Sequence, residues 1–344
     1  MPTKQRRLTS PTADDVRAWH RVRSAALAHD RPGDPLPTLA HVRASLTTVG
    51  PGSRLALWLV HGANDEGVAT AKLRLPAAEG GGRLASVELT VHPAHRRMGM
   101  GSRLLATVVA AATEEDCRRL STEVLAGTPG ESFLATREFV PALRLTWQRL
   151  VLAEIPERIV KLPDVPHPGY RLAAWEGAPP DALAESFAAA RAALADMPSG
   201  GLEVSRTRWD AERVRMTAEL AARRGERLLN HAAISEADGS VAGYTKLTLP
   251  AEADEGGDGG AGDASSARAR AKQLDTAVVA AHRGHGLGLW LKSAMLRHLL
   301  DAHPEVTEVV TNTADDNRHM LAVNAALGFR PLRRTVAYQL TLPA

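Results

Sequence analysis

Apolar and polar positions along the 344-residue chain repeat one order of elements in its two halves. The pattern in the first half predicts helices over 12–28, 39–46, 99–112 and 132–137, and strands over 7–9, 54–61, 67–75, 83–91 and 120–125, with two late strands ending near 152. In the second half it predicts helices over 181–195, 208–224, 287–302 and 315–327, and strands over 170–173, 227–235, 241–249, 273–279, 306–312 and 336–340. The second half therefore repeats the order of the first.

Two segments interrupt this pattern. Residues 154–168 contain four prolines, a density that predicts a stiff linker between a domain at 1–153 and a second domain at 169–344. The chain is long enough for two domains that each bury a core. Residues 251–266 are acidic and glycine-rich, and we expect a mobile loop there. Such a loop beside the site could also attract or shield a cationic substrate.

One motif occurs twice, at residues 88–101 and 275–288, and a single offset relates the copies (275 − 88 = 187). Each copy is an apolar strand, a basic turn, a G-x-G pair and a long apolar helix. Free N–H groups at a helix start attract anions, and glycine lets a phosphate approach the main chain. Alternatively, G-x-G only allows close helix packing, but its repetition with Arg96 and Arg283 favours a phosphate site. The P-loop pattern is absent, and Leu104 and Leu291 replace the third glycine of the dinucleotide fingerprint.

The turns Arg96-Arg-Met-Gly99-Met-Gly101 and Arg283-Gly-His-Gly286-Leu-Gly288 resemble the coenzyme A pyrophosphate motif, R-x-x-G-x-G/A, of the Gcn5-related N-acetyltransferases (GNAT). The second half also carries Asn312 after a strand, and Asn317 before a helix that ends in Gly328-Phe329, which is similar to a later motif of that family. The resemblance covers both halves, so the chain looks like a tandem GNAT protein of the mycothiol-synthase-like kind.

The resemblance implies an α/β (α+β) fold of two tandem GNAT domains, each a mixed, twisted sheet with helices on both faces. It implies that two neighbouring strands splay apart and that acetyl-CoA lies in the gap, bonded by backbone groups near Val91 and Val278. The residues expected to bind this cofactor are Val278, Arg283, Gly284, His285, Gly286, Leu287, Gly288 and Asn317 in the second half, and Val91, Arg96, Arg97, Met98, Gly99, Met100 and Gly101 in the first.

Acetyl transfer to an amine needs a base, because an ammonium ion has no lone pair. Glu88 and Asp275 hold the same place in the two copies, eight residues before the motif arginine, and either is a candidate base. The alternative for each is a surface carboxylate paired with a nearby arginine. The family often has a tyrosine as general acid seven residues after the helix asparagine, and Asn324 stands there (317 + 7 = 324), an amide that can donate a hydrogen bond but no proton.

The first half departs further from the family, with Glu138-Phe139 in place of Gly-Phe. We therefore expect an acetyl-CoA-dependent N-acetyltransferase that modifies a primary amine of a small molecule, with the chemistry in the second half. The alternative is a non-catalytic coenzyme A binder that serves as a sensor or in assembly.

Composition and charge exclude several other classes. The net charge is only +3, and the sequence has no basic stripe interleaved with aromatic residues, so we expect no nucleic-acid partner. His282 and His285 lack the further ligands that a metal site needs, and Cys117 is the only cysteine, so no intrachain disulfide is possible. We find no signal peptide and no apolar run long enough for a membrane, and we expect a cytoplasmic protein whose oligomeric state stays open.

Overall fold

The computed structural model describes residues 3–50, 52–76, 84–196, 200–202, 208–250 and 269–343. The chain forms two compact units. Unit 1 comprises Met1–Leu143, Ser199–Arg206 and Val336–Ala344, and unit 2 comprises Arg144–Pro198 and Thr207–Thr335. The predicted loop at 251–266 lies outside the described residues.

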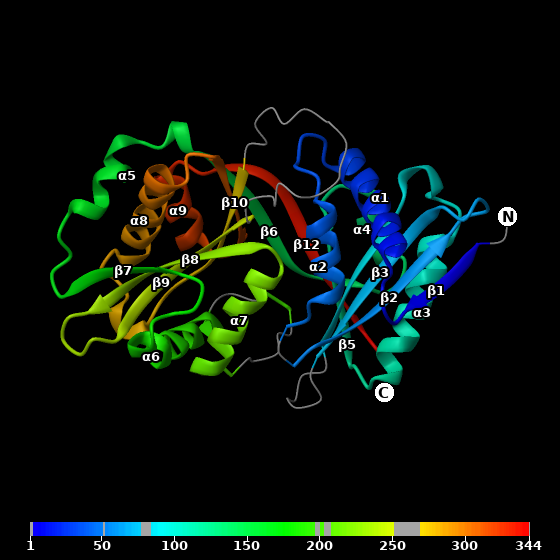
Figure 1. The fold of residues 1–344 in the computed structure, drawn as a ribbon, viewed down its shortest axis with the longest axis horizontal. Helices are drawn as coiled ribbons and strands as arrows, with labels where there is room; N and C mark the ends of the chain where they lie inside the picture. Colours follow the sequence, from blue (N-terminus) through cyan, green and yellow to red (C-terminus); the bar gives the residue numbers. More distant parts are fainter. Residues whose placement is uncertain are drawn as a thin grey trace. The chain divides into compact units, whose positions relative to one another are not determined.

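Unit 1 is a mixed sheet with helices on both faces (Figure 1). Its strands lie in the order β1-β2-β3-β4-β5-β12; the pairings from β1 to β4 are antiparallel, and β4 pairs with β5 in parallel. Its elements, apart from the shared strand β12, are β1 (Lys4–Leu8), α1 (Ala13–Asp30), α2 (Leu39–Thr47), β2 (Arg54–His61), β3 (Gly67–Leu75), β4 (Leu84–Val91), η1 (Pro93–His95), α3 (Met100–Glu114), β5 (Arg119–Leu125) and α4 (Pro129–Ala135).

Unit 2 repeats this plan in the order β12-β6-β11-β10-β9-β8-β7, with a parallel pairing between β10 and β11. Its elements are β6 (Val140–Val151), η2 (Leu152–Glu154), α5 (Glu157–Lys161), η3 (Leu162–Asp164), β7 (Tyr170–Glu176), α6 (Asp181–Ala192), η4 (Ala193–Asp196), α7 (Ala211–Arg223), β8 (Glu226–Ser235), β9 (Val241–Pro250), β10 (Ala269–Val278), η5 (Ala280–His282), α8 (Leu287–Ala302), β11 (Val306–Ala314), α9 (Arg318–Leu327) and β12 (Arg330–Thr341).

Alternation along the strands gives each sheet two apolar faces. On β2, Leu57 and Leu59 pack in the core under α1 and α2, whereas Trp58 between them packs in the core under α3. In unit 2, Tyr244 of β9 belongs to the core beneath α6 and α7, and Leu247 belongs to the core beneath α8. The expected architecture, two mixed sheets each covered on both faces, is therefore confirmed.

The division of the chain differs from the predicted 1–153, 154–168 and 169–344. Strand β6 pairs with β11 along residues 145–151, so this part of the first half of the sequence completes the sheet of unit 2. Conversely, Val336 and Tyr338 near the end of the chain lie in the hydrophobic core of unit 1. Strand periodicity predicts that such a segment is extended, but it does not specify which strand it pairs with.

Residues 154–168 are not an extended linker. Pro156 is the N-cap of α5, and Pro163 lies in the first turn of η3, positions where a missing N–H removes no hydrogen bond. Ile159 of α5 is buried with Leu150 and Leu327 in the core of unit 2. The segment is therefore part of that unit's core.

Candidate functional site

The two motif copies form turns of nearly the same backbone geometry. Gly99 and Gly286 are the N-caps of α3 and α8, with φ angles of 76° and 74°, and neither helix start has a side-chain cap. Glycine adopts this left-handed conformation without strain, and with no capping side chain in place the first-turn N–H groups can bind an anion. Arg97 has φ 64° where Gly284 has φ 85°, so the copies share the conformation as well as the spacing.

Each motif arginine is tied to the end of its own strand. Arg96 Nε donates to the Val91 carbonyl over 3.2 Å, and Arg283 Nε donates to the Val278 carbonyl over 3.1 Å. The guanidinium of Arg96 also makes a bidentate ion pair with Asp30 at the end of α1, with two N–O distances of 2.7 Å. Asp30 therefore competes with any phosphate for this arginine, a partner that no sequence signal indicates.

Of the other residues predicted at the turns, some can offer only their backbone to a ligand. Met100 and Leu287 are buried in the cores of their units, so their side chains do not reach the surface of the turn. A Cβ at Gly101 would meet the Phe133 ring at 3.4 Å, which indicates that this glycine serves helix packing. A Cβ at Gly288 would meet no heavy atom within 4 Å.

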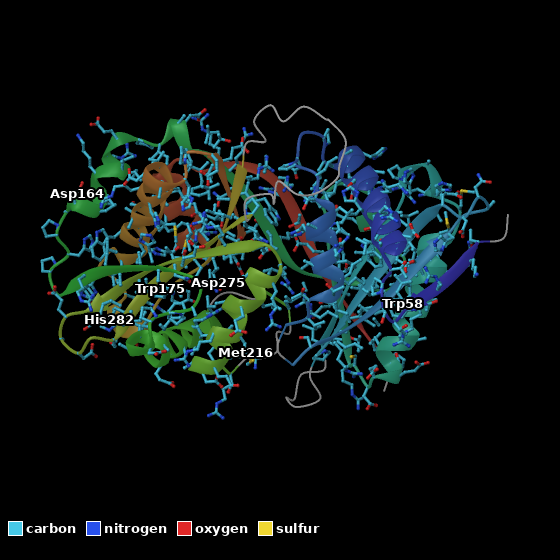
Figure 2. All side chains as sticks on the ribbon, viewed as in Figure 1. Trp58, Asp164, Trp175, Met216, Asp275 and His282 are labelled. Carbon is cyan, nitrogen blue, oxygen red and sulfur yellow. The ribbon has the colours of Figure 1, made fainter. Side chains whose placement is uncertain are left out.

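Histidines and aromatic rings surround the turn before α8. The Tyr170 hydroxyl lies 3.0 Å from His282 Nδ1, and His285 Nδ1 lies within hydrogen-bonding distance of the carbonyls of His282 and Arg283. His167 stacks on Trp290 with ring centroids 4.2 Å apart. His282 lies well apart from Asp275 on β10, as Figure 2 shows.

The parallel strand pair in each unit splays apart before its end. In unit 1, β4 pairs with β5 only from Leu84 to Ser86, although β4 continues to Val91. In unit 2, the pairing of β10 with β11 ends at Lys272, although β10 continues to Val278. Both predicted gaps are present, and Val91 and Val278 lie on the splayed parts of the strands.

The two candidate bases lie in similar surroundings. Glu88 forms an ion pair of 2.7 Å with Lys72 on β3, and its side chain remains 60% exposed. Burial opposes the shift, but the charge of Lys72 and its hydrogen bond lower the pKa of Glu88. Glu88 is thus paired with a neighbouring cation, a lysine where an arginine was expected, and its role as a base stays a prediction.

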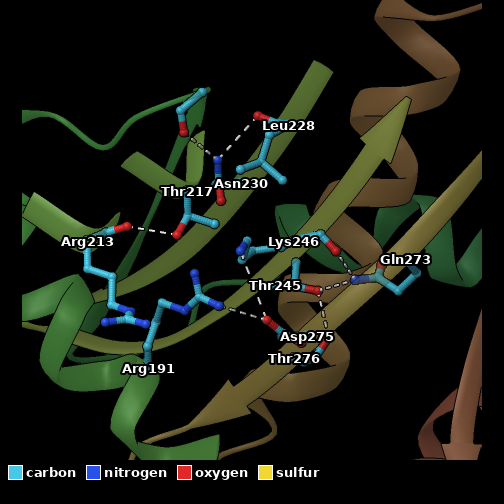
Figure 3. A network of polar contacts seen from close by, with 11 residues as sticks. Arg191, Arg213, Thr217, Leu228, Asn230, Thr245, Lys246, Gln273, Asp275 and Thr276 are labelled. Atoms are coloured by element: carbon cyan, nitrogen blue, oxygen red, sulfur yellow. Dashed lines mark hydrogen bonds and ion pairs between the residues drawn. The ribbon is translucent and has the colours of Figure 1, made fainter. Parts of the chain in front are cut away.

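Asp275 contacts two buried cations (Figure 3). Its Oδ2 lies 3.2 Å from Arg191 Nη2 on α6 and 4.0 Å from Lys246 Nζ on β9. The side chains of Arg191 and Lys246 are only 6% and 4% exposed, whereas that of Asp275 is 37% exposed. The carboxylate of Asp275 is therefore partly exposed to solvent and lies against two buried cations.

A bulge distinguishes the two copies. Leu274 and Asp275 lie opposite Lys246 alone, because the register of β10 against β9 shifts between Gln273 and Thr276. In unit 1 the pairing of β4 with β3 is regular through Glu88. Gln273 donates to Thr245 Oγ1 and to the Lys246 carbonyl, which fixes the bulged strand (Figure 3). A bulge re-aims side chains, and this one directs Asp275.

Sequence reasoning missed the two lysines, although a signal for them exists. Strands β3 and β9 share the run Lys-Leu-x-Leu, at 72–75 and at 246–249. A lysine in a strand whose other residues are mostly apolar is unusual, because its charge is costly to bury. The lysines are thus a second repeated feature, and each faces the carboxylate of the motif strand.

Asn324 has a different setting from the predicted one. It is fully buried, accepts from Lys292 Nζ over 2.7 Å, and donates to Gln148 Oε1 and Thr313 Oγ1. Its amide is therefore held in a core network instead of facing a leaving thiolate. Asn317 is the N-cap of α9, where its Oδ1 accepts from the Met320 amide.

Within the described residues there is no group of three or more side chains that could hold a metal ion. None of the described helices is long and apolar enough to cross a membrane.

The fold agrees with comparisons against known proteins. Residues 38–130 match the model of the acetyltransferase (GNAT) family, so this part of the chain is a GNAT acetyltransferase domain. The whole chain is similar to a solved tandem GNAT protein from the clavulanic acid biosynthesis pathway, with 28% identity, a TM-score of 0.78, and coverage of 100% of this chain and 99% of that one. The expected tandem GNAT arrangement is confirmed.

More distant structures share the fold alone. A GCN5-related N-acetyltransferase from Sphaerobacter thermophilus is 16% identical, with a TM-score of 0.68 and coverage of 99% of this chain and 96% of that one. An N-myristoyltransferase from Saccharomyces cerevisiae is 10% identical, with a TM-score of 0.61 and coverage of 99% and 80%. A search of curated proteins found no match.

Proposed function

We propose that the chain is an acetyl-CoA-dependent N-acetyltransferase that modifies a primary amine of a small molecule, with its chemistry in unit 2. One observation carries the proposal: in unit 2, an uncapped helix start at Gly286, a splayed strand ending at Val278 and a solvent-facing carboxylate at Asp275 belong to one strand-turn-helix segment.

The residues of this segment fit coenzyme A. The first-turn N–H groups of α8 would hold the pyrophosphate, with Arg283 adding charge at the same turn. The unpaired edge of β10 near Val278 offers backbone groups to the pantetheine arm and an N–H to the thioester carbonyl oxygen. Acetyl-CoA supplies an activated acetyl group when it is bound.

Asp275 would take the proton that the amine loses as its nitrogen attacks the thioester carbon. Its Oδ2 is engaged by Arg191 and Lys246, but the carboxylate remains partly exposed and can accept a proton from a bound amine. The two cations also favour the neutral, nucleophilic form of an amine placed beside them. The C–S bond then breaks, and coenzyme A leaves as its thiolate.

Unit 2 is the better candidate for catalysis. In unit 1, Glu88 is held in a close ion pair of 2.7 Å with Lys72, whereas in unit 2 Lys246 lies 4.0 Å from Asp275. We infer that unit 1 retains the fold of a coenzyme A site whose role is structural.

Charge reversal at the two turns tests the assignment. We expect Arg283→Glu to abolish release of free coenzyme A thiol from acetyl-CoA and an amine panel, and Arg96→Glu to retain it. The opposite result would move the chemistry to unit 1. Tight binding of coenzyme A by calorimetry, with no transfer to any amine in a broad panel, would support the non-catalytic binder instead.

A further inference from the structure

The cluster around Asp275 contains more positive charge than its carboxylate can balance. Arg191 and Lys246 both approach the same oxygen, Oδ2, and both side chains are at least nine-tenths buried (Figure 3). A buried charge is unfavourable unless it is paired, so the described residues leave this cluster one negative charge short.

The donors of the two cations are also under-used. Lys246 Nζ lies 4.0 Å from Asp275 Oδ2, beyond hydrogen-bond length, and it donates no hydrogen bond to the described residues. Arg191 Nε is buried without a hydrogen-bond partner among them, while Trp209 covers the face of the guanidinium at 3.5 Å from the ring centroid. The aromatic ring fixes the plane of Arg191 and leaves its edge to select a partner.

In unit 1 the corresponding lysine is paired closely with its carboxylate. Lys72 Nζ lies 2.7 Å from Glu88, so the lysine and the carboxylate satisfy each other directly. The bulge at Leu274 and Asp275 moves the unit 2 carboxylate out of such a close pairing with Lys246. The two copies therefore differ in whether the buried lysine has charge available for a ligand.

We propose that Lys246 and Arg191 form a subsite for an anionic group of the acceptor, so that unit 2 acetylates small amines that also carry a carboxylate or a phosphate. The inference rests on the proposed acetyl transfer and names its substrate class. Lys246 Nζ lies 4.0 Å from Asp275 Oδ2, a spacing that suits an amine and an anion separated by a few bonds. Glycine and β-alanine are the simplest molecules of this kind.

Binding of an anion in this cluster should be linked to protonation of Lys246. Burial and the charge of Arg191, opposed by Asp275, lower the pKa of Lys246 to about 8. Arg191 on α6 and Asp275 on β10 are the charged groups that face it, and burial raises the pKa of the neighbouring Tyr244 on β9, which keeps that phenol neutral. An anion bound at Lys246 would raise the pKa of the lysine again, so binding above pH 8 takes up a fraction of a proton.

The first test measures thiol release in two pairs, β-alanine against β-alaninamide and glycine against glycinamide. A second test compares 2-aminoethyl phosphate with β-alanine in the same assay. We expect wild type to prefer each anionic amine over its amide by about tenfold or more in kcat/KM, the effect of a hydrogen bond to a charged group. Lys246→Met should bring the ratio near one, and Lys246→Arg should keep the preference. A kcat/KM for 2-aminoethyl phosphate larger than that for β-alanine assigns the anion as a phosphate and supports the subsite.

Calorimetry on wild type separates this inference from the proposed function. Binding of propionate, which has no amine to lose a proton, should take up protons at pH 8.5 when measured in two buffers of different ionisation enthalpy, and binding of propionamide should not. Proton-coupled binding without acetyl transfer would support the subsite and refute the transferase. Transfer to β-alanine and β-alaninamide at equal rates, without proton uptake, would overturn the subsite and leave the transferase in place. The matched substitution Lys72→Met should leave the selectivity ratio unchanged, and a changed ratio would contradict the assignment to unit 2.

Discussion

Lys292 on α8 allows a quantitative prediction of stability against pH. Its side chain lies in the core of unit 2 and donates a hydrogen bond to Asn324 Oδ1 over 2.7 Å. Burial without a counter-charge lowers the pKa of Lys292 to about 7. Lys292→Met removes the ammonium and keeps a side chain of similar length.

The sign and size of the effect follow from linkage. Because the pKa is lower in the folded state than its ordinary value of 10.5, the unfolded chain binds the extra proton between pH 7 and 10.5, and wild-type stability rises with pH there. Below pH 7 the buried charge costs about 5 kcal/mol, and at pH 9 about 2 kcal/mol of that cost remains. The methionine leaves the Asn324 carbonyl oxygen without its donor, which costs about 1–3 kcal/mol at every pH.

We therefore expect Lys292→Met to stabilise unit 2 by about 2–4 kcal/mol at pH 6 and by close to zero at pH 9. Urea unfolding of the two proteins at pH 6, 7, 8 and 9 measures this difference. Lys161→Met, on an exposed helix surface, controls for the loss of a positive charge. A difference between wild type and Lys292→Met that stays constant from pH 6 to 9 would refute the reasoning, because it would show that Lys292 is equally protonated in both states.

Three further predictions follow from the structure. Asp30→Asn should release Arg96 and strengthen coenzyme A binding to unit 1 by up to about fivefold, the value of a partly exposed ion pair, as measured by calorimetry in an Arg283→Glu background; unchanged affinity would show that Asp30 does not compete. Burial and the charge of His298 lower the pKa of His231 to about 4, so the unfolded chain binds a proton first and stability should fall by about 3 kcal/mol between pH 6.5 and 4; His231→Gln should remove this slope in urea titrations, and an unaltered slope would assign it to other groups. Deletion of residues 336–344 removes core side chains of unit 1, and hydrogen exchange should show lost protection in β4 and β5, whereas retained protection would contradict the assignment of this segment to that core.

The sequence was sufficient for the features that depend on local pattern. Strand alternation, the helix caps and the two G-x-G turns are encoded within a few residues of one another, so the order of elements and the positions of the two turns were predictable. The carboxylates at 88 and 275 were found because both lie in the repeated motif.

Features that depend on distant parts of the chain were not predictable. The ion pair of Asp30 with Arg96 joins residues 66 positions apart, and no pattern in the sequence links them. The end of the chain completes unit 1, and β6 completes the sheet of unit 2. Both features depend on which strands pair, and periodicity does not encode strand pairing. Asn324 was assigned by its spacing from Asn317, but its environment is set by Lys292 and Gln148, which lie elsewhere in the sequence.

The central claim is that unit 2 transfers acetyl groups and that Asp275 is its base. The most direct measurement compares kcat for acetyl transfer in Asp275→Asn and in the matched variant Glu88→Gln, with coenzyme A affinity and melting temperature recorded for both. We expect kcat to fall about 100-fold or more in Asp275→Asn, the contribution of a general base, and to change little in Glu88→Gln. A large loss in Glu88→Gln with full activity in Asp275→Asn would contradict it.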